Sequence, residues 1–189
     1  LRFRQIEYYR MPMMAYVAVD EPAALTRSDF VRLGLVTGAG DQAQATERTL
    51  PYADAHLADF ERRFCYDRFW SASGAAPRTR YLCSGLSLVV VGDAHNEFYR
   101  CRTRGVLAQF RHQHYLLFLI AHFQKATLLM VSDQLAEALM AMDLTQPQSI
   151  RRFKRRIRIA FVAFLSFTHR YWFHEVSEQA HVKALWKMC

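Results

Sequence analysis

The chain has 189 residues, of which 52% are hydrophobic, 14% aromatic and 22% charged. A polypeptide of this length buries roughly 70% of the surface that its unfolded form exposes, and this composition excludes an intrinsically disordered protein. The formal net charge is +8, and residues 150–189 supply +7 of it, from nine Lys or Arg and two acidic residues. Charge concentrated in one segment favours a polyanionic partner or a membrane surface over a small-molecule substrate.

The cysteines and the hydropathy of the sequence indicate in which cellular compartment the chain is expected. The four cysteines, Cys65, Cys83, Cys101 and Cys189, form no C-x-x-C pair, and a chain of this length does not require disulfides, so we expect buried or incidental thiols in a reducing compartment. The uncharged stretch at residues 112–124 is shorter than the roughly 20 apolar residues of a membrane-spanning helix. We therefore expect a cytosolic chain with no membrane span and no signal peptide.

The first part of the chain mixes short elements. Residues 14–19 and 33–36 are predicted strands, and the second is expected to end at the Gly-Ala-Gly break of residues 38–40. Residues 54–69 repeat apolar side chains at helical spacing and predict a short amphipathic helix. Residues 71–77 read as a loop.

The clearest β signal follows. Residues 80–91 are almost continuously apolar and predict one strand. A polar turn at residues 92–96 leads to residues 98–102, where apolar and basic residues alternate as in a half-buried strand. We therefore predict a β-hairpin over residues 80–103.

The remainder is predicted to be helical. Residues 106–142 contain no Gly or Pro, and the break at residues 144–147 separates them from a second helix over residues 149–188. Each helix has an apolar stripe: Phe110, Leu117, Ala121, Leu128, Leu135 and Leu139 on the first, and Ile150, Phe153, Ile157, Phe161, Phe164, Leu165 and Thr168 on the second. The predicted fold is one α+β domain, in which a small mixed sheet (residues 1–104) packs against two long helices (residues 105–189).

A run of basic residues opens the second helix. The run comprises Arg151, Arg152, Lys154, Arg155, Arg156 and Arg158. On a helix these side chains lie opposite the apolar stripe. They suit a solvated face, nucleic-acid phosphates, anionic lipid headgroups or acidic residues of a neighbouring subunit.

Catalytic signatures are missing from the sequence. It contains no phosphate-binding Gly-rich loop, no G-x-S-x-G elbow and no H-E-x-x-H motif, so we expect no enzyme and no cofactor. His174 and Glu178 are the only well-spaced pair of potential metal ligands, at i and i+4 on the predicted helix.

Three segments carry a family resemblance. Residues 104–115 (RGVLAQFRHQHY), 120–126 (IAHFQKA) and 167–177 (FTHRYWFHEVS) resemble the cytoplasmic N-terminal region of CorA-like divalent-cation transporters. The resemblance covers the whole chain and implies a fragment of a longer membrane protein. The Gly-Met-Asn pore signature and the two membrane spans of that family are not in this sequence.

The resemblance implies a function and partners. It implies a homo-pentamer at the cytoplasmic face of the bacterial inner membrane, with a regulatory role in which divalent cations such as Mg²⁺ bind at subunit contacts. Asp133, Glu137 and Asp143 are the acidic candidates for such a site, although an exposed helix face explains them equally well. The alternative is a soluble binder of nucleic acid or anionic lipid through the basic amphipathic helix of residues 150–165.

Overall fold

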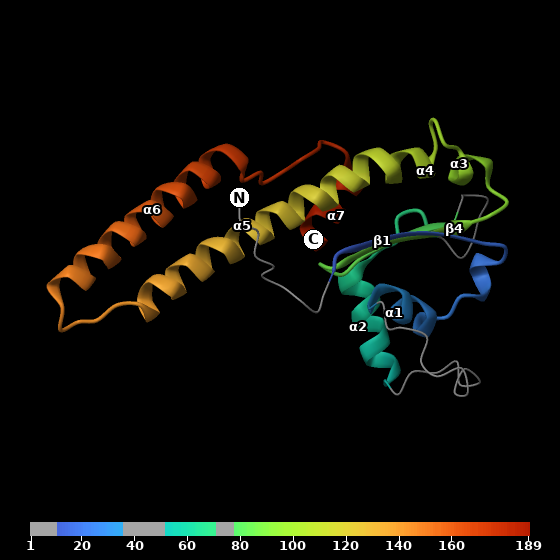
Figure 1. The fold of residues 1–189 in the computed structure, drawn as a ribbon. Coiled ribbons are helices and arrows are strands. Elements are labelled where there is room, and N and C mark those ends of the chain that lie inside the picture. Colours follow the sequence, from blue (N-terminus) through green and yellow to red (C-terminus); the bar gives the residue numbers. More distant parts are fainter. Residues whose placement is uncertain (1–10, 36–51, 71–77) are drawn as a thin grey trace. The chain divides into compact units, whose positions relative to one another are not determined.

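The computed structural model describes residues 11–35, 52–70 and 78–189 (Figure 1). The elements follow in this order: β1 (Met13–Val19), η1 (Pro22–Ala24), α1 (Arg27–Leu35), α2 (Asp54–Phe64), β2 (Cys65–Tyr66), β3 (Thr79–Cys83), β4 (Ser87–Asp93), α3 (Glu97–Arg100), α4 (Val106–Gln109), the π-helical turn η3 (Phe110–His114), α5 (Tyr115–Met140), α6 (Pro147–Tyr171) and α7 (Ala180–Met188).

The chain divides into two compact units. We call one the sheet unit; it comprises Arg10–Phe118 and Glu175–Cys189. We call the other the hairpin unit; its described part is Leu119–His174. The sheet and α7 therefore belong to one unit, and α6 with most of α5 belongs to the other.

The sheet unit is built on four strands in the order β1-β4-β3-β2. β1 runs parallel to β4, with Met13 opposite Ser87 and Val19 opposite Asp93. The other two pairings are antiparallel. The predicted α+β class with a small mixed sheet is confirmed.

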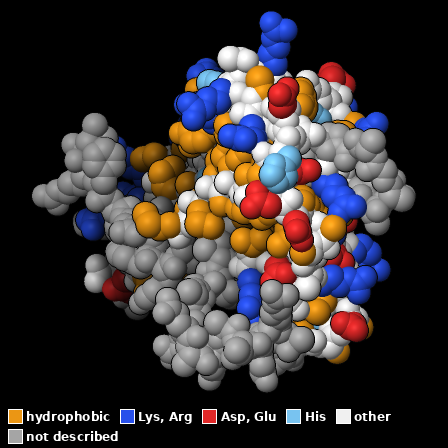
Figure 2. Space-filling model, turned by 90° about the vertical axis from the view of Figure 1, so that its right-hand side faces the viewer, with side chains coloured by type: hydrophobic (Ala, Val, Ile, Leu, Met, Phe, Trp, Pro, Cys, Tyr) orange, Lys and Arg blue, Asp and Glu red, His pale blue; other side chains and the backbone are white. Residues whose placement is uncertain are grey.

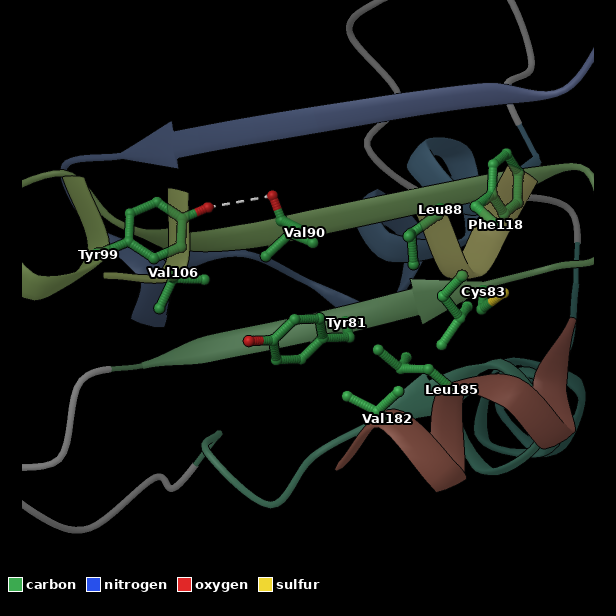
Figure 3. Close-up of a cluster of buried hydrophobic side chains, with 10 residues drawn as sticks. Tyr81, Cys83, Leu88, Val90, Tyr99, Val106, Phe118, Val182 and Leu185 are labelled. Atoms are coloured by element: carbon green, nitrogen blue, oxygen red, sulfur yellow. Dashed lines mark hydrogen bonds between the residues drawn. The ribbon is translucent and has the colours of Figure 1, made fainter. Parts of the chain in front are cut away.

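Helices cover both faces of this sheet. On one face, Tyr81, Cys83, Leu88 and Val90 pack against α4, the start of α5 and α7 (Figure 3). On the other face, the alternate residues Leu82, Val89 and Val91 pack against Phe30 of α1 and Phe60 of α2. A strand buried on both sides has a continuous apolar sequence, which explains the unbroken run in β4.

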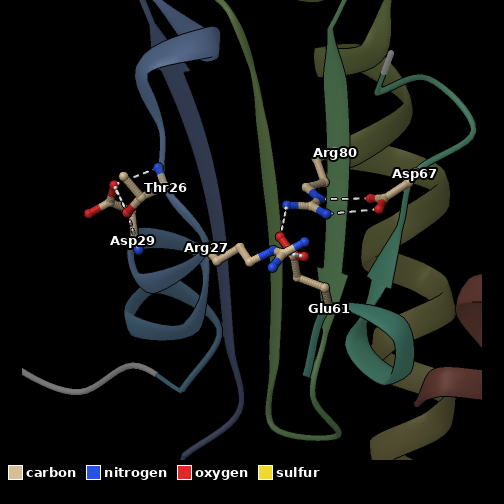
Figure 4. Close-up of polar contacts among 6 residues, drawn as sticks. All are labelled: Thr26, Arg27, Asp29, Glu61, Asp67 and Arg80. Carbon is tan, nitrogen blue, oxygen red and sulfur yellow. Dashed lines mark hydrogen bonds and ion pairs between the residues drawn. The ribbon is translucent and has the colours of Figure 1, made fainter. Parts of the chain in front are cut away.

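A buried ion-pair network ties β3 to α2 and to the residues that follow β2. The Arg80 side chain is only 5% exposed, and it donates from Nε and Nη2 to the two carboxylate oxygens of Asp67, at 2.7 and 2.8 Å (Figure 4). Its Nη1 donates to Glu61 Oε1 at 3.0 Å, and its guanidinium lies 4.3 Å from the centroid of the Phe30 ring. Because each of the three guanidinium nitrogens has a carboxylate partner, the charge is buried with its compensation.

The predicted strand at residues 33–36 is wrong, because Leu33 to Leu35 lie in α1. The hydroxyl of Thr26 accepts from the N–H of Asp29, and the Asp29 carboxylate accepts from the N–H of Thr26 (Figure 4). This reciprocal capping starts a helix ahead of the predicted strand. The Gly-Ala-Gly break and the predicted loop at residues 71–77 lie outside the described residues.

The predicted hairpin is also misplaced. The true hairpin, β3–β4, lies inside the stretch read as one strand, and its turn is made possible by Gly85 at a φ of +73°. The predicted second strand at residues 98–102 is instead occupied mainly by α3. Asn96 caps that helix, since its side-chain oxygen accepts from the N–H of Tyr99 at 2.9 Å.

The long helices differ in how well they were predicted. The first is a continuous helical run, Val106–Met140, as predicted. The second is wrong as a single helix, because α6 ends at Tyr171 and α7 begins at Ala180. His174 and Glu178 lie in the non-helical connection between them, so the spacing that suggested a ligand pair does not place them on one helix face.

Candidate interaction surface on the α5–α6 hairpin

α5 and α6 form an antiparallel pair within the hairpin unit. Near one end, the Phe123 ring lies 6.0 Å from that of Phe167, and near the other end Glu137 pairs with Arg156 at 3.8 Å. The residues buried between the helices are Gln124, Val131 and Ala138 on α5 and Ala160 and Phe167 on α6. On α5 these positions recur every seven residues, which is the spacing of a helix-pairing seam.

The turn between the helices is held by short polar contacts. Asp143 Oδ1 accepts from the N–H and the hydroxyl of Thr145, at 2.9 and 2.6 Å. These hydrogen bonds lower the pKa of Asp143. The N–H of Asp143 donates to the hydroxyl of Ser149 at 2.9 Å, which joins the turn to the first turn of α6. The Asp143 carboxylate therefore has a local structural role in the turn.

The hairpin exposes more large apolar side chains than its seam buries. The exposed ones are Leu119, Phe123, Leu128, Leu129, Met130, Leu135, Leu139, Met140, Leu144, Ile159, Phe161, Val162, Leu165 and Tyr171. Five of them belong to the predicted packing stripes: Leu128, Leu135, Leu139, Phe161 and Leu165. These five stay exposed beside the seam; Leu128 and Leu135 lie three or four residues from its buried positions, so they border it on α5. A monomeric soluble protein rarely leaves an apolar surface of this extent uncovered.

The six basic residues of α6, Arg151, Arg152, Lys154, Arg155, Arg156 and Arg158, are all exposed. Arg156 is the only one that forms an ion pair within the described part of the chain. Acidic and basic side chains are intermingled on the face of the protein drawn in Figure 2. On α6 the six basic side chains gather on about two helical turns, which suits a negatively charged partner.

The candidate metal ligands do not converge. Asp133 and Glu137 lie one turn apart on α5, while Glu178 pairs with Lys183 of α7 at 3.1 Å. Among the described residues, no three His, Cys, Asp or Glu side chains are grouped so that they could hold a metal ion. We therefore assign no metal ligands among the described residues.

The helical run Val106–Met140 is long and apolar enough to cross a membrane, judged by length and composition alone. The core helices of soluble proteins meet the same criterion. In this chain Val106, His114, Leu117 and Phe118 are buried in the sheet unit. The first third of the run is thus a core helix.

Comparisons of the chain with models of protein families, with curated proteins and with solved structures find no match.

Proposed function

We propose that this chain is the cytoplasmic regulatory and assembly domain of a CorA-like divalent-cation transporter, and that copies assemble through the α5–α6 hairpin. The family assignment rests on the three sequence segments described above. The assembly role is carried by one observation: the hairpin leaves large apolar side chains exposed outside its own seam.

The spacing of these side chains suits contact with another helix. Leu128, Leu135 and Leu139 follow one another at steps of seven and four residues, so they share one side of α5. Helices that pair use this spacing. A second copy of the hairpin offers a complementary apolar face, because Phe161 and Leu165 are exposed on α6.

A membrane is a less suitable cover for the same surface. If the hairpin were inserted, α6 would bring Arg155, Arg156 and Arg158 toward the hydrocarbon together with α5. Each arginine near the bilayer centre costs roughly 2.5–3.5 kcal/mol. Protein contacts leave these side chains at the edge of the interface, in water.

The test is the mass of the chain in solution. The triple variant L128Q/L135Q/L139Q removes one apolar side of α5, and light scattering after size exclusion is expected to show that it is monomeric where the unaltered chain associates. The matched control is Phe98→Gln, which replaces an exposed aromatic residue of the sheet unit and is expected to leave the mass unchanged. Equal masses for the unaltered chain and the triple variant at every concentration would refute assembly through α5.

Two further measurements test the CorA-like identity: the number of subunits in the assembly and its response to Mg²⁺. A five-fold assembly is expected, and a dimer would contradict the family assignment while leaving the interface intact. Adding Mg²⁺ after removal of divalent cations is expected to change the mass or the protease sensitivity of the assembly. Indifference to Mg²⁺ would contradict the regulatory part of the proposal.

A second candidate function is supported by the unpaired charges of α6. Arg151, Arg155 and Arg158 form no ion pair with the described residues, so they remain available to a polyanion. The variant R151Q/R155Q/R158Q is expected to weaken sedimentation with phosphatidylserine vesicles, or binding to single-stranded RNA, in a salt-dependent manner. The control R62Q/R63Q/R100Q removes the same charge from the sheet unit. Equal effects of the two triple variants would contradict recognition by α6.

A further inference from the structure

We propose that Cys83 and Cys189 are an oxidation site, at which a reversible disulfide fastens α7 to the central sheet. Their sulfur atoms lie 2.9 Å apart, although 106 positions separate them in the chain. A disulfide has an S–S distance of about 2.05 Å, so the two sulfurs need to approach by only about 1 Å. This inference does not depend on the proposed function.

Both cysteines are held by ordered elements of the sheet unit. Cys83 is the last residue of β3 and is fully buried beside Leu185 of α7 (Figure 3). Cys189 follows α7, and its N–H donates to the carbonyl of Leu185 at 3.1 Å. Val182 and Leu185 anchor α7 in the core. The contact between the sulfurs is thus a consequence of the way in which α7 packs on the sheet.

The other two cysteines do not compete for this partner. Cys65 belongs to the cluster on the opposite face of the sheet. Cys101 lies after α3, where its sulfur contacts the hydroxyl of Thr103 at 3.4 Å. The geometry therefore specifies one pairing among the four cysteines.

The two thiols differ in access and in acidity. Cys83 is shielded from solvent, whereas Cys189 is partly exposed, so an oxidant in solution meets Cys189 first. The two sulfurs share a hydrogen bond in which either thiol can be the donor. This contact lowers the pKa of Cys83, and the same contact together with burial raises the pKa of Cys189. Because Cys83 is out of reach of an oxidant in solution, access makes Cys189 the entry point, and Cys83, the thiol of lowered pKa, completes the reaction.

The oxidant we invoke is a small disulfide such as oxidised glutathione. The Cys189 thiolate attacks one of its sulfurs, forms a mixed disulfide and releases one glutathione thiolate, which takes up a proton. Cys83 then loses its proton, attacks the Cys189 sulfur and expels the second glutathione. In sum, the two protein thiols lose two electrons and two protons, and one oxidised glutathione becomes two reduced molecules. Because the pKa of Cys189 is raised, the first step is expected to accelerate as the pH rises.

The experiment equilibrates the whole chain with mixtures of reduced and oxidised glutathione and maps its peptides by mass spectrometry without reduction. The expected product is a monomer in which the peptide of Cys83 is linked to that of Cys189. Hydrogen exchange of the α7 amides is expected to slow by about 10-fold or more in the oxidised form, because α7 loses its freedom to detach.

Two variants separate the proposal from incidental oxidation. Cys101→Ser is the matched control and is expected to keep the cross-link. Cys189→Ser removes a sulfur at the end of α7 without opening the core, and it is expected to lose both the cross-link and the slowed exchange. Glutathione adducts on Cys101 or Cys189 without a Cys83–Cys189 link would overturn the proposal, and so would a different pairing of the four cysteines.

Discussion

The imidazole rings of His114, on η3, and His181, on α7, meet edge to face in the core of the sheet unit, with 5.7 Å between their centroids. Tyr81 of β3 packs against the same His114 ring at 5.3 Å. His114 is fully buried, and neither of its ring nitrogens has a hydrogen-bond partner among the described residues. A protonated imidazole in this position would be a buried charge without compensation.

This relationship predicts that the chain loses stability in mild acid. Burial, followed by the nearby His181, lowers the pKa of His114 to about 4, whereas an unfolded histidine titrates near 6.5. The unfolded state therefore binds the proton first, so stability is complete above about pH 7 and falls as the pH drops from about 6.5 to about 4. The expected loss is about 3 kcal/mol in the free energy of unfolding, measured by urea titration at a series of pH values.

His114→Phe is expected to flatten this part of the pH profile, because it keeps a ring in the core but removes the titrating group. The control is His95→Gln, since His95 has an exposed side chain. A profile that is equally steep in His114→Phe and in the unaltered chain would show that other groups cause the loss.

Arg80 is expected to be the most sensitive charged residue of the sheet unit. Arg80→Met would leave the carboxylates of Asp67 and Glu61 without their shared partner, although Arg27 would still pair with Glu61 at 2.9 Å. We expect a loss of about 3 kcal/mol in the free energy of unfolding, measured by chemical denaturation.

Arg80→Lys tests the geometry of the same interaction. Lysine keeps the charge but lacks the planar guanidinium that binds both oxygens of Asp67. Arg80→Lys is therefore expected to lower the free energy of unfolding measurably, but by less than Arg80→Met. The control is Arg62→Gln, which removes an exposed arginine of α2 and is expected to change little. Equal stability of Arg80→Met and Arg62→Gln would contradict a structural role for the network.

Gly105 is expected to tolerate no side chain. A Cβ atom at this position would overlap the backbone carbonyl oxygen of Phe98 and would lie 2.8 Å from the Cβ of Cys101. Because backbone cannot move aside by a rotamer change, Gly105→Ala is expected to lose about 3 kcal/mol, visible as a lower thermal midpoint. Gly85→Asn is the comparison: no described atom lies within 4 Å of its Cβ position, and asparagine accepts the positive φ. A larger loss in Gly85→Asn than in Gly105→Ala would refute the argument.

Two phenylalanines of α6 provide a matched test of the hairpin unit. Phe167 is 6% exposed and packs against the rings of Phe123 and Trp172, whereas Phe161 is 56% exposed. Phe167→Ala is expected to destabilise the hairpin by about 3 kcal/mol, and Phe161→Ala is expected to have little effect on the isolated chain. The stability of the hairpin in each variant is measured by hydrogen exchange of the α6 amides. Similar protection in the two variants would mean that the seam is assigned to the wrong face of α6.

Several elements were predictable because their signals are local. The strand at residues 14–19 and the helix at residues 106–142 correspond to β1 and to the continuous run of α4, η3 and α5. Their apolar periodicity and the lack of Gly and Pro in the second segment require no knowledge of partners. The start of α6 was also signalled by Pro147 in its first turn.

Other boundaries depended on contacts that are distant in sequence. Residues 98–102 alternate like a strand, yet the Asn96 cap and the burial of Tyr99 against β4 favour a helix there. No Gly or Pro marks the end of α6 at Tyr171. The second predicted helix is divided because Val182 and Leu185 pack on the sheet.

For the candidate site, the sequence by itself determined that six cations share one helix, since their spacing and the helical repeat suffice to put them on a common surface. Only the tertiary structure decided which apolar residues of α5 and α6 face each other, because an all-round apolar helix such as α5 has no preferred side until a partner packs against it. The contacts of Cys83 with Cys189 and of His114 with His181 were also decided only by the tertiary structure. They depend on how the sheet, η3 and α7 pack around one core, and no local sequence pattern predicts that packing.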